Sequence, residues 1–181
     1  MRELSLHIMD IVENSVAAGA KQVFISVSED TAGNRLRISV KDDGRGIPED
    51  RLDQVLDPFY TTRTTRRVGL GLSLFREASR RCEGEFTLRS TEGQGTEVSA
   101  SFRRDHLDLA PLGDMATSVA GLIMGNSEVD FIYTHEKDGR VFRIDTLELR
   151  RALEDVPITH PEVIKTVKDS IRESLQELKG A

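Results

Sequence analysis

Residues 42–48 read Asp-Asp-Gly-Arg-Gly-Ile-Pro, and they follow directly on residues 36–40, in which apolar and polar side chains alternate. The alternation predicts a β-strand with one buried face, which the Asp-Gly pair ends. Glycines at 44 and 46 let the backbone adopt positive φ and approach a flat ligand closely. The carboxylate of Asp42, beside Gly44 and Gly46, can accept a hydrogen bond from a ligand amine. The alternative is a plain strand-to-helix turn.

Segments on both sides of this motif alternate between strand and helix patterns. Antiparallel hairpins mixed with helices predict an α+β fold, a two-layer α/β sandwich with a mixed, mostly antiparallel sheet. Strand patterns cover residues 23–27, 36–40, 85–90 and 96–102, and helical patterns cover residues 4–18, 49–55 and 70–81.

The stretch 105–110 is the best candidate for a junction between two parts of the chain. We therefore expect one domain at 1–104 and an α/β C-terminal extension at 105–181. The extension shows a helix from Pro111 to about Gly125, a hairpin with strands at 129–134 and 140–145, and helices at 146–155 and 161–178.

The first helix carries a polar group of side chains, Asp10, Glu13 and Asn14. Asp10 and Asn14 are four residues apart, so they share one helical face. Oxygen ligands of this kind can hold a hydrated Mg²⁺. Taken alone, the group is also typical of a solvated helix face.

Glycines and hydroxyl residues gather in two further places. Gly69 and Gly71 stand at the start of a helix, where exposed backbone N–H groups favour anions. The preceding residues 61–67 carry hydroxyls and arginines that suit a flap over phosphates. Each feature has a structural alternative, namely a packing contact, a simple loop or a hairpin turn. The arginines of the first segment are Arg63, Arg66 and Arg67. The second glycine-rich segment is Gly93-Gln94-Gly95-Thr96.

The order and spacing of these motifs are more specific than any one of them. Asn14, the glycine motif after Asp42, Asp57-Pro-Phe-Tyr-Thr-Thr, Gly-Leu-Gly-Leu and Gly-Gln-Gly-Thr follow one another along residues 1–104. This series resembles the ATP-binding domain shared by histidine kinases, gyrase, the mismatch-repair ATPase and the ATP-dependent chaperone.

The resemblance implies a role for each residue and ATP with Mg²⁺ as the ligand. Asn14 would bind the Mg²⁺, and Asp42 would accept the adenine amine. Gly44 and Gly46 would shape the base pocket, with Thr96 supporting the base through water. Gly69 and Gly71 would present N–H groups to the phosphates, and the flap candidates are Arg63, Arg66 and Arg67.

The sequence departs from the family at Asp10. Hydrolysing members place a glutamate there, four residues before the asparagine, as the base for water. Aspartate is one methylene shorter, and a misplacement of about 1 Å can lower the rate about a hundredfold, so hydrolysis is in doubt. Phosphoryl transfer depends mostly on positioning and charge stabilisation. Since the domain starts at the first residues, we expect no phospho-accepting helix in this chain and favour a kinase acting in trans, with an ATPase switch or an ATP sensor as alternatives.

Composition narrows the remaining classes. The net charge is −6, and residues 1–104 carry 16 basic and 16 acidic side chains against 9 and 15 in residues 105–181. An acidic C-terminal part argues against nucleic acid as a partner. No apolar run is long enough for a membrane helix, and one cysteine allows no internal disulfide. We expect a cytoplasmic protein with a protein partner, and the amphipathic last helix offers a surface for a homodimer.

Overall fold

The computed structural model describes residues 3–57 and 70–180. Its helices are α1 (Leu4–Ala17), α2 (Leu70–Arg81), α3 (Met115–Gly125), α4 (Thr146–Leu153) and α5 (Pro161–Lys179). Its strands are β1 (Gln22–Asp30), β2 (Arg35–Asp42), β3 (Phe86–Thr91), β4 (Gly95–Arg103), β5 (Asp130–Lys137) and β6 (Arg140–Asp145). Two short 3₁₀ turns, η1 (Glu49–Arg51) and η2 (Gln54–Leu56), replace the single helix expected at 49–55.

The six strands form one sheet in the order β3-β4-β2-β1-β5-β6. Four of the five strand pairs are antiparallel, and only β1 and β5 run parallel. The hairpins expected from the alternating pattern are present at β1–β2, β3–β4 and β5–β6. The predicted mixed, mostly antiparallel sheet is therefore confirmed.

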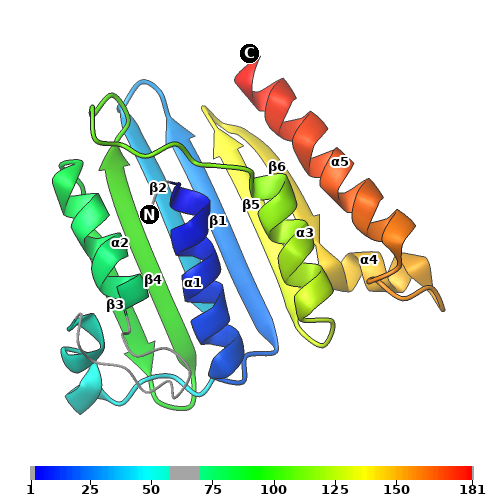
Figure 1. Ribbon diagram of the computed structural model, residues 1–181, viewed down its shortest axis with the longest axis horizontal. Coiled ribbons are helices and arrows are strands. Elements are labelled where there is room, and N and C mark those ends of the chain that lie inside the picture. Colours follow the sequence, from blue (N-terminus) through cyan, green and yellow to red (C-terminus); the bar gives the residue numbers. More distant parts are fainter. Residues whose placement is uncertain (1–2, 58–69, 181) are drawn as a thin grey trace.

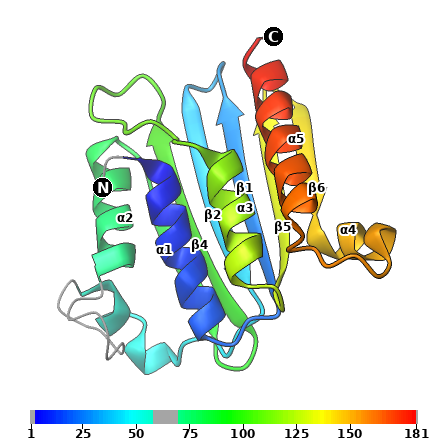
Figure 2. The ribbon, with the colours of Figure 1, turned by 45° about the vertical axis from the view of Figure 1, so that its right-hand side comes forward.

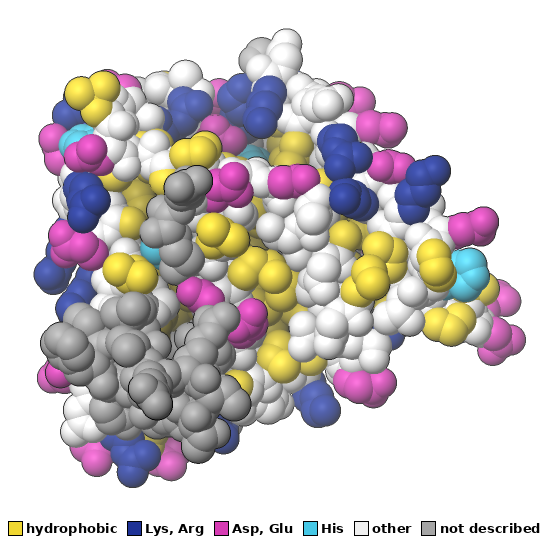
Figure 3. All heavy atoms as spheres, viewed as in Figure 1, with side chains coloured by type: hydrophobic (Ala, Val, Ile, Leu, Met, Phe, Trp, Pro, Cys, Tyr) yellow, Lys and Arg dark blue, Asp and Glu magenta, His cyan; other side chains and the backbone are white. Residues whose placement is uncertain are grey.

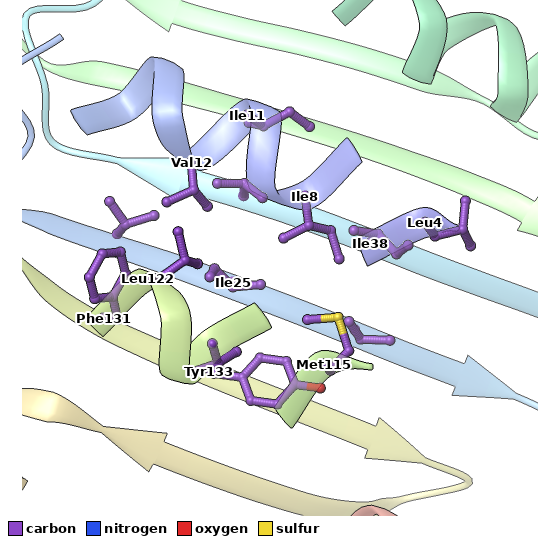
Figure 4. Packing of buried hydrophobic residues seen from close by; sticks show 14 of the residues in the cluster. Leu4, Ile8, Ile11, Val12, Ile25, Ile38, Met115, Leu122, Phe131 and Tyr133 are labelled. Carbon is purple, nitrogen blue, oxygen red and sulfur yellow. The ribbon is translucent and has the colours of Figure 1, made fainter. Parts of the chain in front are cut away.

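Helices α1, α2, α3 and α5 cover one face of the sheet and make a second layer (Figures 1 and 2). The core lies between the layers, where α1 and α3 meet the inward side chains of β1, β2 and β5. Figure 4 shows Ile8 and Val12 of α1 beside Ile25, Ile38 and Leu122. On this covered face hydrophobic side chains gather over α1 and α3, between charged groups of both signs (Figure 3). The two-layer sandwich is the predicted architecture.

The C-terminal segment extends the sheet of the first segment instead of standing apart from it. β5 pairs along β1 over eight residues, from Gln22 with Asp130 to Glu29 with Lys137. The stretch before α3 also caps α1, because Leu4 and Ser5 donate their backbone N–H groups to the carbonyl oxygens of Pro111 and Leu112 at 2.9 and 2.8 Å. The division into 1–104 and 105–181 thus follows motif content and not a break in the sheet.

The start of α3 differs from the expectation at Pro111. The helix begins at Met115, and the side chain of Asp114 accepts a hydrogen bond from the N–H of Thr117. Proline at 111 resembles a first helical residue, but its carbonyl is used by α1, and Gly113 then takes a φ of +89°. The N-cap aspartate is therefore the true start signal.

A buried polar chain ties β1 to β5 at the end of the sheet away from residues 42–48. The Tyr133 hydroxyl lies 2.8 Å from Nδ1 of His135, and Nε2 of His135 lies 2.9 Å from the Glu29 carboxylate. Arg104 also pairs with Glu29, at 3.3 Å. The hydrogen bond with His135 lowers the pKa of Glu29, and burial raises the pKa of Tyr133. The buried side chains of Tyr133 and His135 are thus hydrogen-bonded, and the partly buried Glu29 links them to the first segment.

Among residues 3–57 and 70–180, no helix has the length and apolar character needed to cross a bilayer.

Candidate functional site

The polar face of α1 carries Asp10 and Asn14, which lie one helical turn apart, as predicted from their spacing. Asn14 is exposed and Asp10 is half-buried. A Cβ atom built on Gly71, in the first turn of α2, would lie 3.3 Å from Cβ and 3.6 Å from Oδ2 of Asp10. The side chain of Asp10 therefore lies against the start of α2.

Asp42 ends β2 as a buried carboxylate that the chain holds in one orientation. The Ser15 hydroxyl donates to Oδ2 at 2.6 Å, and the backbone N–H of Gly44 donates to Oδ1 at 2.8 Å. Asp42 is 7% exposed, whereas the neighbouring Asp43 is exposed and accepts the N–H groups of residues 21 and 22. The two aspartates thus differ in role: Asp43 stabilises the loop through backbone hydrogen bonds, and the side chain of Asp42 is buried.

The turn after Asp42 fits between the end of α1 and the β3–β4 turn. Arg45 donates its N–H to the carbonyl of Ala18 and accepts from the N–H of Gly93, at 3.0 and 2.7 Å. Gly46 has a φ of +69°, and a Cβ there would overlap the carbonyl oxygen of Thr91. This close approach of two backbones explains why the second glycine of the motif is required.

Thr96 stands opposite Asp42 in the β2–β4 register. Its Oγ1 lies 2.8 Å from Oγ of Ser90, which donates to the carbonyl of Gly95 and accepts from the N–H of Ile47. Because the single Ser90 proton goes to Gly95, Thr96 donates to Ser90 and keeps an oxygen lone pair for a further donor. Thr96 and Asp42 therefore present acceptors from adjacent strands.

The structure places Asp10 of α1 next to Gly71 of α2, with Asn14 one turn further along α1, and it gathers Asp42, Gly44, Gly46 and Thr96 around the end of β2. In Figure 1 the segment after β2 lies at the lower edge, next to the C-terminal end of α1. Four predicted residues lie outside the described residues: Arg63, Arg66, Arg67 and Gly69.

Two serines of the site were not predicted. Ser15 lies 27 positions before Asp42, and Ser90 lies six before Thr96. Serine is common on helices and strands, so neither stands out alone. The available signal was the inward face of the first helix, on which a hydroxyl at Ser15 must find a buried partner.

The side-chain atoms of this site that could bind a metal are oxygens. The described residues contain no group of three or more His, Cys, Asp or Glu side chains placed to hold a metal by themselves. Mg²⁺ does not need such a cage, because it keeps several waters and takes one or two protein oxygens plus phosphate oxygens. The amide oxygen of Asn14 fits that role.

His7 lies one turn before Asp10 and is buried, at 3% exposure. Its ring packs against Phe75 of α2, with centroids 5.3 Å apart, and its Nδ1 has no hydrogen-bond partner among the described residues. Burial, aided by the charged N-terminus and opposed by Asp10, lowers the pKa of His7 from 6.5 to about 4. The histidine is therefore neutral at pH 7.

His7→Leu should flatten the pH dependence of stability. Between pH 6.5 and about 4 the unfolded chain binds a proton at His7 that the folded chain does not. The free energy of unfolding of the wild type therefore decreases as the pH is lowered through this window. The loss attributable to His7 is on the order of 2–3 kcal/mol. Urea unfolding from pH 7.5 downward should show the variant losing less, with His106→Gln behaving like wild type; equal slopes for all three would contradict the assignment.

The sequence is similar to a known protein family and to individual sensor protein kinases. Residues 2–106 match the family described as Histidine kinase-, DNA gyrase B-, and HSP90-like ATPase. The Sensor protein kinase WalK of Staphylococcus haemolyticus is 33% identical over 96 residues, and that of Staphylococcus saprophyticus is 34% identical. Each match covers 49% of this chain but 16% of the kinase.

Two solved structures share the fold. The N terminal domain of a DNA repair protein superposes with a TM-score of 0.55 at 18% identity, covering 80% of this chain and 52% of that one. The Aquifex aeolicus MutL ATPase domain complexed with ADP gives 0.50 at 17% identity, covering 85% and 68%. With the family match over residues 2–106, this chain belongs to the histidine kinase-, DNA gyrase B- and HSP90-like ATPases and carries their ATP-binding domain.

Proposed function

We propose that the chain is a regulatory protein that binds ATP with Mg²⁺ and transfers the γ-phosphate to a partner protein. The observation that carries the nucleotide site is the buried carboxylate of Asp42, oriented by Ser15 and by the N–H of Gly44. A fixed acceptor of this kind discriminates for an amine such as that of adenine, because an unpaired buried polar group is costly. Gly46 would shape the base pocket by letting the loop after Asp42 pack against the backbone of Thr91, and Thr96 offers an acceptor to a bridging water.

The phosphates would lie between α1 and the start of α2. Asn14 would hold Mg²⁺, which would neutralise phosphate charge, and Asp10 would face the same space. Gly69 and Gly71 would offer backbone N–H groups, which favour anions at a helix start. The arginines Arg63, Arg66 and Arg67 are proposed to close over the phosphates.

Similarity to sensor protein kinases supports transfer over hydrolysis. In the transfer, the bond from the γ-phosphorus to ADP breaks, a bond to the acceptor side chain forms, and the acceptor loses its proton. The acceptor is proposed to lie on another protein in the cytoplasm. The histidines of this chain are not proposed as the acceptor, because His7 and His135 are buried and Nδ1 of both His106 and His160 already accepts a backbone N–H.

An ATP-hydrolysing switch is the second candidate, and the position of Asp10 favours it. The carboxylate lies against Gly71 at the start of α2, where a base for water would be needed. A non-catalytic ATP sensor is the third candidate. In every case residues 1–104 are proposed to bind the nucleotide, and residues 105–181 are proposed as an extension whose last helix serves a homodimer or another partner.

Labelled ATP separates these candidates. The protein is incubated with γ-labelled ATP and Mg²⁺, alone and with cell extract, beside Asp42→Asn as a variant whose ATP binding is expected to be weakened. A protein in the extract that gains label only with the wild-type chain supports the kinase. Free phosphate released by the pure protein and not by Asp42→Asn supports the switch. Binding without either product leaves the sensor and contradicts the kinase.

Asp10→Asn should leave ATP affinity within about threefold of wild type and abolish any hydrolysis, because the amide cannot take a proton from water. Glu13→Gln removes the same charge from the same helix but at a position about 100° from Asn14 around the axis, so it is the matched control. Phosphate release that survives in Asp10→Asn would show that Asp10 is not the base.

A further inference from the structure

The face of the sheet opposite the helix layer is uncovered along β3, β4 and β2. Helices α1, α2, α3 and α5 all lie on the other side (Figures 1 and 2). Because strand side chains alternate, residues flanking the buried Ile38 and Val40 of β2 point to the uncovered face. This face is therefore exposed to solvent and to any partner.

A row of hydroxyl side chains crosses the middle of the uncovered face. Ser39 of β2 pairs in register with Ser26 of β1 on one side and with Ser99 of β4 on the other, and Ser99 pairs with Thr87 of β3. These side chains are short, so a bound main chain can come close to the sheet and find hydroxyl partners. The row forms the floor of a surface with longer side chains on both sides.

The longer side chains are mostly cationic. Arg37 lies two residues before Ser39 and Lys41 two residues after it, so the two are about 13 Å apart along the strand. Arg89 of β3 lies in the same row as Lys41, with Glu97 between them in the register. Arg37, Lys41 and Arg89 make no hydrogen bond or ion pair with the rest of the described chain, in contrast to Arg103, which pairs with Glu83 and Asp105.

A shallow hollow continues this surface beside Arg37. Its volume is about 420 Å³, and it forms an acidic border to the cations, because four carboxylates line it together with Arg35 and Arg37: Glu29, Asp30, Glu136 and Asp138. The residues that stand opposite Arg37, Lys41 and Arg89 in the register include one carboxylate, Glu97, in a protein with a net charge of −6. Uncompensated cations on one face of an acidic protein are complementary to an acidic partner.

We propose that this basic sheet face, defined by Arg37, Lys41 and Arg89 around the hydroxyl row, docks an acidic segment of a partner protein. Carboxylates of the segment pair with the three cations, and its main chain bonds to the serine and threonine hydroxyls. A polypeptide is favoured over nucleic acid because Glu97 and Glu136 interrupt the cations and would repel a continuous line of phosphates. The docking needs no ATP chemistry and so goes beyond the proposed function.

The test uses the full chain and a fluorescein-labelled peptide of alternating glutamate and serine, followed by fluorescence anisotropy at low salt. The triple variant R37Q/K41Q/R89Q should bind at least about tenfold more weakly, and added salt should weaken wild-type binding. The matched control R80Q/R151Q/K165Q removes the same charge from exposed helix positions and should bind like wild type. Thermal melts should be alike for all three proteins, since every replaced side chain is exposed.

Backbone amide NMR adds a readout of place, with shifts expected on β2, β3 and β4 when peptide is added. Several results would overturn the proposal. These are no binding by wild type, equal weakening in both triple variants, tighter binding of a single-stranded DNA probe on the same face, or a concentration-dependent dimer that only R37Q/K41Q/R89Q abolishes. The last result would assign the face to a second copy of the chain.

Discussion

Gly95→Ala should lower the free energy of unfolding by about 3–5 kcal/mol and weaken ATP binding at least about tenfold. Gly95 has a φ of +105°, and a Cβ there would overlap the carbonyl oxygen of Asp42 and lie 2.8 Å from its carbonyl carbon. Both neighbours are backbone atoms of β2, so no flexible side chain can yield. The strand must shift where it holds the carboxylate of the site.

Gly93→Ala is the matched control for this change. Gly93 also has a positive φ, of +77°, but a Cβ there has nothing within 4 Å. It should therefore lose only the conformational term, about 1–2 kcal/mol, and keep its ATP affinity. Urea unfolding and calorimetry with ATP measure both quantities. If the two alanine variants behave alike, the overlap with Asp42 does not determine the geometry of the site.

The second large effect is expected from Asp42→Asn, which should weaken ATP binding at least about tenfold, because a hydrogen bond to a charged group contributes about 1.5–3 kcal/mol. The folded state should tolerate the change. The amide oxygen can accept from Gly44, and the amide N–H can donate to the Ser15 hydroxyl, which now accepts. A donor then faces the adenine amine, so the loss falls on binding and not on folding.

Asp43→Asn removes the same charge one residue away and provides the control. Its Oδ1 accepts the N–H groups of Lys21 and Gln22, at 2.8 and 2.9 Å, and the side chain is exposed. Calorimetry should find its ATP affinity within about twofold of wild type, because surface changes of this kind rarely exceed 0.5 kcal/mol. Unchanged affinity in Asp42→Asn would remove the adenine assignment.

The sequence predicted the elements of this fold well where one face is buried. Alternation at Val23, Ile25 and Val27 predicts β1 because these side chains all enter the core. The partner of β5 was not predictable, because a parallel pair between residues more than 100 positions apart leaves no local pattern. The start of α3 was predicted wrongly at Pro111 for the opposite reason, because a tertiary contact with α1 overrides the local helix-start signal.

The close-packed turn after β2 was predictable from its glycines and carboxylates. Gly44 and Gly46 stand out because both pack closely against neighbouring parts of the chain, but a positive φ, which was expected for both, is found at Gly46 and not at Gly44. Ser15 and Ser90 do not stand out, since their roles arise from the register that places them beside Asp42 and Thr96. The roles of all these residues toward a nucleotide, including those of Asp10, Asn14, Asp42 and the flap arginines, stay predictions until they are measured.

The capping of α1 by Pro111 and Leu112 limits how short a fragment of this chain can be and still fold by itself. The first N–H groups of the helix that carries Asp10 and Asn14 are satisfied by carbonyls beyond residue 104, and β1 borders β5 along its length. A fragment cut at the end of the shared motifs would leave those donors bare and turn a central strand into an edge, which invites aggregation. The smallest autonomous nucleotide-binding unit of this chain is therefore larger than the region that its motifs mark out.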